Sequence, residues 1–135
     1  MSASSAKNEG PLVLVVDDEA PVRQMERRIL QLHGFRVIEA ANGPEALAVL
    51  EKGQPLDLLI ADLEMPELAG EEMVRRIHTS RRELKVLYVT GNIDRLLDKR
   101  LLREGEAFLD KPFSSEGLVE AVSLLLTGSI RSVKK

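Results

Sequence analysis

Short apolar runs alternate with segments of helical periodicity along most of the chain. The run 12–16 has no polar position, which is typical of a strand buried on both faces of a sheet. From Pro21 to His33 apolar residues recur every three or four positions, and Gly34 follows as a helix stop. The segment 35–40 alternates more, as an edge strand does. These patterns predict a strand–helix–strand unit at the start of the chain.

The same alternation continues to the end of the chain. Asn42-Gly43-Pro44 marks a turn with Pro44 at a helix start, and Ser114 is a candidate N-cap for the last helix. The further predicted strands are 57–61, 84–89 and 106–109, and the further predicted helices are the one from Pro44 and those at about 68–79, 93–102 and 114–126. Five strand–helix units imply an α/β fold, a doubly wound, five-stranded parallel sheet with five helices on its two faces.

Ionisable or hydroxyl-bearing residues follow four of the five predicted strands. They are Asp17-Asp18 and Glu19 after the first, Asp62 after the third, Thr90 after the fourth, and Lys111-Pro112 after the fifth. The second strand contributes no such group. Each residue alone has an ordinary explanation, as a helix cap, a turn residue or a surface lysine. Because active clefts of parallel sheets lie at the carboxyl ends of the strands, their joint placement predicts a site there.

The chemistry of such a site follows from its charges. Clustered carboxylates repel and raise one another's pKa, and a hard divalent cation relieves this. Mg²⁺ prefers oxygen ligands, and Lys111 would add a second positive charge. A carboxylate held beside Mg²⁺, an ammonium and the Thr90 hydroxyl is arranged to accept a phosphoryl group, because that transfer depends mostly on positioning and charge stabilisation.

Four motifs occur together: LVVDDE at 14–19, DLEMPELAG at 62–70, VTGN at 89–92 and FLDKPF at 108–113. In order and spacing they resemble the response-regulator receiver domain, the phosphoacceptor module of two-component signalling. The resemblance covers roughly residues 11–126 and implies a flavodoxin-like sheet of order 2-1-3-4-5. Outside it, residues 1–10 are expected to be a disordered tail and residues 127–135 a C-terminal tail.

Site roles follow from the resemblance, residue by residue. Asp62 would be the phosphorylated aspartate. Asp18 would bind Mg²⁺ directly and Asp17 mainly through water, while Asp62 and the backbone carbonyl of Glu64 would complete the protein ligands. Lys111 would pair with the phosphoryl oxygens.

Other residues would act in switching and hydrolysis. The hydroxyl of Thr90 would swing to the phosphoryl group on activation, and Phe108, where the family often has tyrosine, would rotate into the space left. Glu64 and Asn92 would flank the approach of the hydrolytic water and tune dephosphorylation. The peptide bond before Pro112 would be cis.

The phosphoryl donor is expected to be another molecule. His33 and His78 lie in no recognisable phosphotransfer motif, so the donor would be a histidine kinase, a histidine phosphotransfer protein or a small acyl phosphate. The helices at about 93–102 and 114–126 carry more apolar residues than a core stripe requires, and with the fifth strand they form one face of the domain. This face could bind an effector, the donor or a second copy of the chain.

Composition removes several classes of function. A net charge of −3 without a basic run in the body argues against nucleic-acid binding. The longest wholly apolar run has five residues, far below the ~20 needed to cross a membrane. The first ten residues lack the apolar core of a secretory signal, so a cytoplasmic location is expected. Without cysteine there is neither a disulfide nor a thiolate metal site.

The expected function is a phosphoacceptor switch, which assists its own phosphorylation and dephosphorylation and is not an enzyme. Two alternatives stand beside it. A Mg²⁺-dependent phosphatase of the haloacid-dehalogenase type needs an Asp-x-Asp nucleophile motif on the first strand, where this chain has Asp17-Asp18. A degenerate receiver that only binds partners would not need the full set of charged residues present here. The chain could be a stand-alone receiver, which Met1 favours, or part of a hybrid histidine kinase, which the segment 86–122 resembles.

Overall fold

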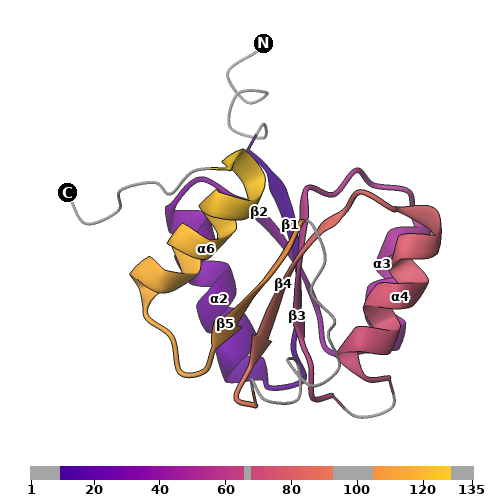
Figure 1. Ribbon diagram of the computed structural model, residues 1–135, viewed down its shortest axis with the longest axis horizontal. Helices are drawn as coiled ribbons and strands as arrows, with labels where there is room; N and C mark the ends of the chain where they lie inside the picture. Colours follow the sequence, from indigo (N-terminus) through magenta and orange to yellow (C-terminus); the bar gives the residue numbers. More distant parts are fainter. Residues whose placement is uncertain (1–9, 66–67, 93–104, 129–135) are drawn as a thin grey trace.

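Five parallel strands form one sheet in the computed structural model, which describes residues 10–65, 68–92 and 105–128 (Figure 1). The strands are β1 (Leu12–Val16), β2 (Arg36–Ala40), β3 (Leu58–Asp62), β4 (Lys85–Thr90) and β5 (Glu106–Asp110). Their order is β2-β1-β3-β4-β5, which confirms the predicted sheet and the edge position of the second strand.

Helices cover both faces of the sheet (Figure 1). They are α2 (Ala20–Leu32), α3 (Gly43–Glu51), α4 (Gly70–Ser80) and α6 (Ser115–Thr127). In the figure α2 and α6 lie on one side of the sheet, and α3 and α4 lie on the other. The predicted helix at about 93–102 falls outside the described residues. None of the helices in the described ranges is long and apolar enough to span a membrane.

Local sequence sets where the helices begin. The side chain of Asn42 accepts a hydrogen bond from the amide of Glu45 at 2.8 Å, and Pro44 lies in the first turn of α3. Ser114 Oγ accepts from the amide of Gly117 at 2.9 Å, as its predicted role as an N-cap requires.

The core consists of two apolar layers separated by the sheet. Leu14 and Val16 point into the layer beneath α3 and α4, whereas Val13 and Val15 point into the layer beneath α2 and α6. All residues of β1 and β3 are buried, which explains why both strands have almost no polar positions. These two adjacent strands therefore hold their carboxyl ends in fixed positions.

Three strands, β3, β4 and β5, end one residue later than predicted, and in two of them the added residue belongs to the predicted site. β3 includes Asp62, which pairs with Val89 of β4, and β4 includes Thr90, which pairs with Asp110 of β5. The two polar side chains are thus anchored by the register of the sheet, and not by the loops that follow. This anchoring limits how far their Cα atoms can move relative to one another.

Candidate functional site

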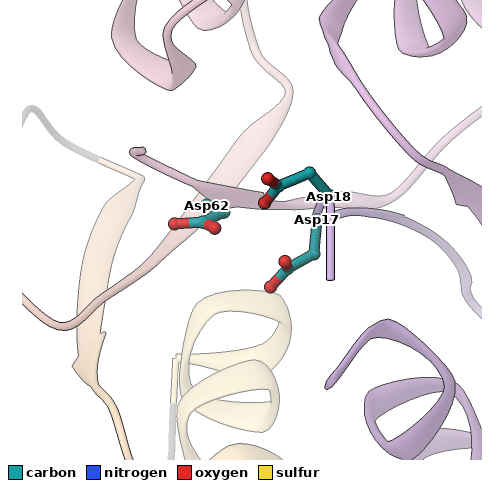
Figure 2. A group of neighbouring side chains, drawn as sticks. All are labelled: Asp17, Asp18 and Asp62. Atoms are coloured by element: carbon teal, nitrogen blue, oxygen red, sulfur yellow. The ribbon is translucent and has the colours of Figure 1, made fainter. Parts of the chain in front are cut away.

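Three carboxylates meet at the carboxyl ends of β1 and β3. Asp17 and Asp18 follow β1, and Asp62 ends β3 beside it (Figure 2). One oxygen from each of the three lies within 4.8 Å of the others. Asp17 is 1% exposed and Asp62 is 5% exposed, while Asp18 faces solvent. The sequence prediction that these residues converge is therefore matched by their placement.

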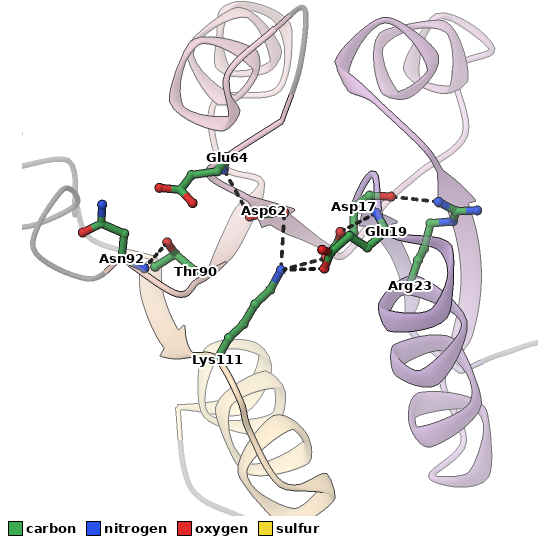
Figure 3. Close-up of polar contacts among 8 residues, drawn as sticks. All are labelled: Asp17, Glu19, Arg23, Asp62, Glu64, Thr90, Asn92 and Lys111. Carbon is green, nitrogen blue, oxygen red and sulfur yellow. Dashed lines mark hydrogen bonds and ion pairs between the residues drawn. The ribbon is translucent and has the colours of Figure 1, made fainter.

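Lys111 reaches this cluster from the far edge of the sheet (Figure 3). Its Nζ lies 3.3 Å from Asp17 Oδ2 and 3.4 Å from Asp62 Oδ2, so one ammonium bridges both buried carboxylates. Glu19 Oε1 is further away, at 3.9 Å. The backbone amide of Lys111 donates to the carbonyl of Thr90 at 2.9 Å, and the bond from Lys111 to Pro112 is cis.

Each buried carboxylate is also held by a turn amide. Asp17 Oδ1 accepts from the amide of Glu19 at 2.9 Å, and Asp62 Oδ1 accepts from the amide of Glu64 at 3.1 Å. In both residues one oxygen thus binds a backbone amide and the other faces Lys111. The backbone of Glu64 is thereby placed beside Asp62, as the sequence analysis expected, while its side chain is exposed.

Burial makes the charge on Asp62 costly. It raises the pKa of Asp62 from 3.8 to about 6; repulsion by Asp17 acts in the same direction, and the Glu64 amide and Lys111 oppose it. Burial would lower the pKa of Lys111, but attraction to Asp17 and Asp62 outweighs this and raises it. The lysine therefore stays charged, and the pocket favours additional positive charge near Asp62.

Thr90 and Phe108 lie on neighbouring strands beside this pocket. Thr90 is buried, and its Oγ1 accepts a hydrogen bond from the amide of Asn92 at 2.9 Å (Figure 3). Phe108 is paired with Tyr88 in the sheet register, and its side chain is exposed. The Thr90 hydroxyl therefore contacts its own loop in this conformation, and the Phe108 ring is directed at least partly toward solvent.

The second strand supports the site through an ion pair that was not predicted from the sequence. Glu39 of β2 binds Arg23 Nε of α2 at 2.7 Å, and Arg23 NH1 donates to the backbone carbonyl of Asp17 at 2.8 Å. Arg27 also contacts Glu39. Ala41, which follows the second strand, carries no polar group, as predicted, but Glu39 within the strand acts on the site through Arg23. The sequence feature that corresponds to it is an arginine five positions after Asp18, in the first turns of a helix.

A buried carboxyl group on α2 was also missed. Glu26 is 1% exposed, and neither of its oxygens has a hydrogen-bond partner among the described residues. Burial raises the pKa of Glu26 from 4.5 to about 8, and the charge of Asp17 adds to this rise. The side chain is therefore mostly protonated near neutral pH.

Gly70 allows α4 to approach the site closely. A Cβ at this position would lie 2.3 Å from the carbonyl oxygen of Asp62 and 2.9 Å from Cα of Leu63. The amide of Gly70 donates to the carbonyl of Leu63 at 3.1 Å. α4 thus packs directly on the backbone of Asp62 and Leu63.

The two histidines make local structural contacts. His33 Nδ1 lies 3.0 Å from the carbonyl of Ile29, one turn earlier in α2. His78 Nε2 lies 3.0 Å from the carbonyl of Leu84, and its Nδ1 lies 3.9 Å from Glu106 Oε2. Since Glu106 begins β5, the His78 contact lies at the opposite end of the strands from Lys111.

Comparisons with known proteins agree with this geometry. The model of the response regulator receiver domain family matches residues 13–123. The chain is 35% identical over 116 residues to the sensor kinase CckA of Brucella abortus, covering 84% of this chain and 12% of CckA. It is 34% identical over 116 residues to the response regulator MprA of Mycobacterium ulcerans, covering 84% of this chain and 49% of MprA.

Solved structures show the same fold. The chemotaxis protein CheY4 of Vibrio cholerae is 31% identical with a TM-score of 0.77, over 87% of this chain and 99% of that protein. The response regulator TrrA of Thermotoga maritima, solved in complex with Mg²⁺ and BeF, is 30% identical with a TM-score of 0.74, over 86% of this chain and 99% of that protein.

The chain belongs to the response regulator receiver domain family. It is a phosphoacceptor domain of two-component signalling, and domains of this family work with histidine kinases or histidine phosphotransfer proteins. The chain spans about half the length of MprA and about an eighth of CckA.

Proposed function

We propose that Asp62 is the phosphoacceptor of this receiver domain. The observation that carries the proposal is the position of Lys111 Nζ, which lies within 3.4 Å of Asp62 Oδ2 and within 3.3 Å of Asp17 Oδ2. Asp62 is the carboxylate of the cluster that ends a central strand, and its register with β4 fixes its direction. Asp18 is exposed, and Asp17 is more deeply buried than Asp62.

Phosphoryl transfer to Asp62 requires one bond to form and one to break. An oxygen of the Asp62 carboxylate attacks the phosphorus of a phosphohistidine or acyl phosphate, and the bond from phosphorus to the donor breaks. The leaving imidazole or carboxylate keeps the bonding electron pair. Lys111 remains beside the carboxylate and pairs with the phosphoryl oxygens as their charge develops. The domain assists gain and loss of its own phosphoryl group, and turns over no separate substrate.

The donor set fits Mg²⁺. Asp17, Asp18 and Asp62 offer carboxylate oxygens within 4.8 Å of one another, and the backbone carbonyl of Glu64 would add a further hard ligand. Sulfur is absent from this set, and histidine does not contribute to it. When bound, Mg²⁺ would neutralise the cluster and orient phosphoryl oxygens. The Mg²⁺ and BeF complex of TrrA supports this assignment by homology.

Switching would use the residues beside the pocket. The Thr90 hydroxyl would exchange its bond to the Asn92 amide for one to the phosphoryl group, and the Phe108 ring would move inward from its exposed position. Asn92 and Glu64 are both exposed at the rim of the site, where a hydrolytic water would enter. Their side chains would therefore set the lifetime of the phosphoryl group.

The signal would leave through the face of β5 and α6, together with the segment 93–102 outside the described residues. On α6 the residues Leu118, Val119 and Val122 belong to the core, but Leu124 is exposed. With exposed Phe108 on β5, this leaves apolar surface for an effector, a histidine kinase, a phosphotransfer protein or a second copy.

Mass spectrometry after treatment with acetyl phosphate and Mg²⁺ tests the proposal. The wild-type chain should gain one phosphate, and Asp62→Asn should gain none. Asp57→Asn is a matched control, because Asp57 lies at the opposite end of β3, where its Oδ2 accepts from the amide of Leu12 at 2.8 Å. A phosphate on the Asp62→Asn protein would contradict the assignment.

A further inference from the structure

Arg23 links three elements beneath the acidic cluster. It lies in the first turn of α2, is only partly exposed, and binds Glu39 of β2 at 2.7 Å. Its NH1 donates to the backbone carbonyl of Asp17 at 2.8 Å (Figure 3). The amide of Asp17 donates in turn to the carbonyl of Ala40 at 3.2 Å. The backbone at the end of β1 is thus held from α2 and from β2.

The carbonyl that Arg23 binds belongs to the peptide group between Asp17 and Asp18. A peptide group is planar, so fixing its oxygen also fixes the direction from Cα of Asp17 to Cα of Asp18. Asp18 is exposed and thus gains little orientation from packing. The direction in which its carboxylate leaves the backbone depends therefore on this peptide plane.

The contribution of Arg23 is geometric more than electrostatic. Glu39 compensates its charge through a direct ion pair at 2.7 Å, and the contact of Arg23 with Asp17 is to the backbone carbonyl and not to the carboxylate. A guanidinium can donate to a carbonyl and a carboxylate at once through its planar fork, which a lysine ammonium matches poorly. The chain thus has a residue type suited to both contacts.

We propose that Arg23, held in place by Glu39, is a positioning residue of the cation site. By fixing the peptide group between Asp17 and Asp18, it places the carboxylates of both residues for a divalent cation. This inference rests on the proposed function, in which that cation is Mg²⁺. Groups that orient metal ligands typically change metal affinity by 10- to 100-fold when removed.

Calorimetric titration with Mg²⁺ tests the inference. Arg23→Ala should weaken Mg²⁺ binding about tenfold. Arg23→Lys should fall between wild type and Arg23→Ala, because lysine can keep one of the two contacts. Arg27→Ala is the matched control, because Arg27 contacts Glu39 whereas Arg23 is the residue that binds the carbonyl of Asp17. The Mg²⁺ affinity of the Arg27→Ala protein should stay within about twofold of wild type.

A second measurement separates positioning from general stability. Phosphorylation of Arg23→Ala by acetyl phosphate should be slow at limiting Mg²⁺ and return toward the wild-type rate at saturating Mg²⁺. Thermal unfolding is recorded in parallel; a purely structural role would lower the midpoint and leave the Mg²⁺ affinity unchanged. If Arg23→Ala does not fold, Arg23→Lys and Glu39→Gln give the same comparison.

The outcomes distinguish the two proposals. Equal Mg²⁺ affinities in wild type, Arg23→Ala and Arg23→Lys would overturn the positioning role and leave the proposed function intact. A wild-type chain that binds no Mg²⁺ would overturn the proposed cation site, and the positioning role with it. Weaker binding in the Arg23 variants but not in Arg27→Ala would support both.

Discussion

Protonation of Glu26 should make the stability of this domain depend on pH. The pKa of Glu26 rises from 4.5 to about 8 in the folded state because the side chain is buried. Between these two values the folded chain keeps a proton that the unfolded chain has lost. Stability therefore falls as pH rises through this window, by about 1.4 kcal/mol for each pH unit. The loss is complete above pH 8, where the carboxylate is charged in both states.

The size of the effect follows from the same values. pH 7 lies 2.5 units above the unfolded-state pKa of 4.5, so the free energy of unfolding has by then fallen by about 3 kcal/mol. This is a large part of the ~5–15 kcal/mol that stabilises a typical domain. Glu26→Gln has nearly the same shape but cannot ionise, so this pH-dependent loss should be absent. The buried amide carries its own desolvation cost, which does not vary with pH.

Urea denaturation followed by circular dichroism, in EDTA and from pH 5 to pH 8, measures the difference. The free energy of unfolding of Glu26→Gln minus that of wild type should increase by roughly 3 kcal/mol across this range. Glu51→Gln changes an exposed carboxylate at the end of α3 and should follow the wild-type curve. Parallel curves for wild type and Glu26→Gln would show that Glu26 does not hold a proton in the folded state across this pH range.

Three further predictions concern the site and its output. Asp18→Ala should reduce Mg²⁺ affinity more than Asp17→Ala, because Asp18 is assigned the direct contact; equal affinities by titration would contradict that ordering. Gly70→Ala should lower the free energy of unfolding by about 1–3 kcal/mol in chemical denaturation, because the new Cβ would meet a backbone carbonyl at 2.3 Å; unchanged stability would show that α4 can move away freely. Beryllofluoride with Mg²⁺ should change amide NMR shifts across residues 93–109 and 114–126, and shifts confined to the pocket loops would exclude this face as the output.

The sheet and the position of the carboxylates could be predicted because both follow from short-range patterns. Wholly apolar runs identify the central strands β1 and β3, and parallel strands bring their carboxyl ends to one edge. Asp17, Asp62 and Lys111 therefore meet, although 94 positions separate the first from the last. The order of the strands came from the family resemblance.

The buried face of α2 could not be predicted from its sequence. Helical spacing correctly predicted the helix, but Met25 is 43% exposed and Leu32 is 77% exposed, while Glu26 is buried in their place. Which face a helix buries is set by its position over the sheet, and that position depends on contacts between distant residues. The pairing of Arg23 with Glu39 is of the same kind, because it joins α2 to β2 across the turn at Gly34.

The residue that carries the phosphoryl group, which we propose to be Asp62, can be identified chemically. Borohydride reduces an aspartyl phosphate to homoserine, so reduction after acetyl phosphate treatment marks the modified position for peptide sequencing by mass spectrometry. Homoserine is expected at position 62 alone. The reaction should need Mg²⁺ and should slow in Lys111→Ala, where the bridging ammonium is lost. Homoserine at position 17 or 18, with aspartate unchanged at 62, would contradict the assignment to Asp62.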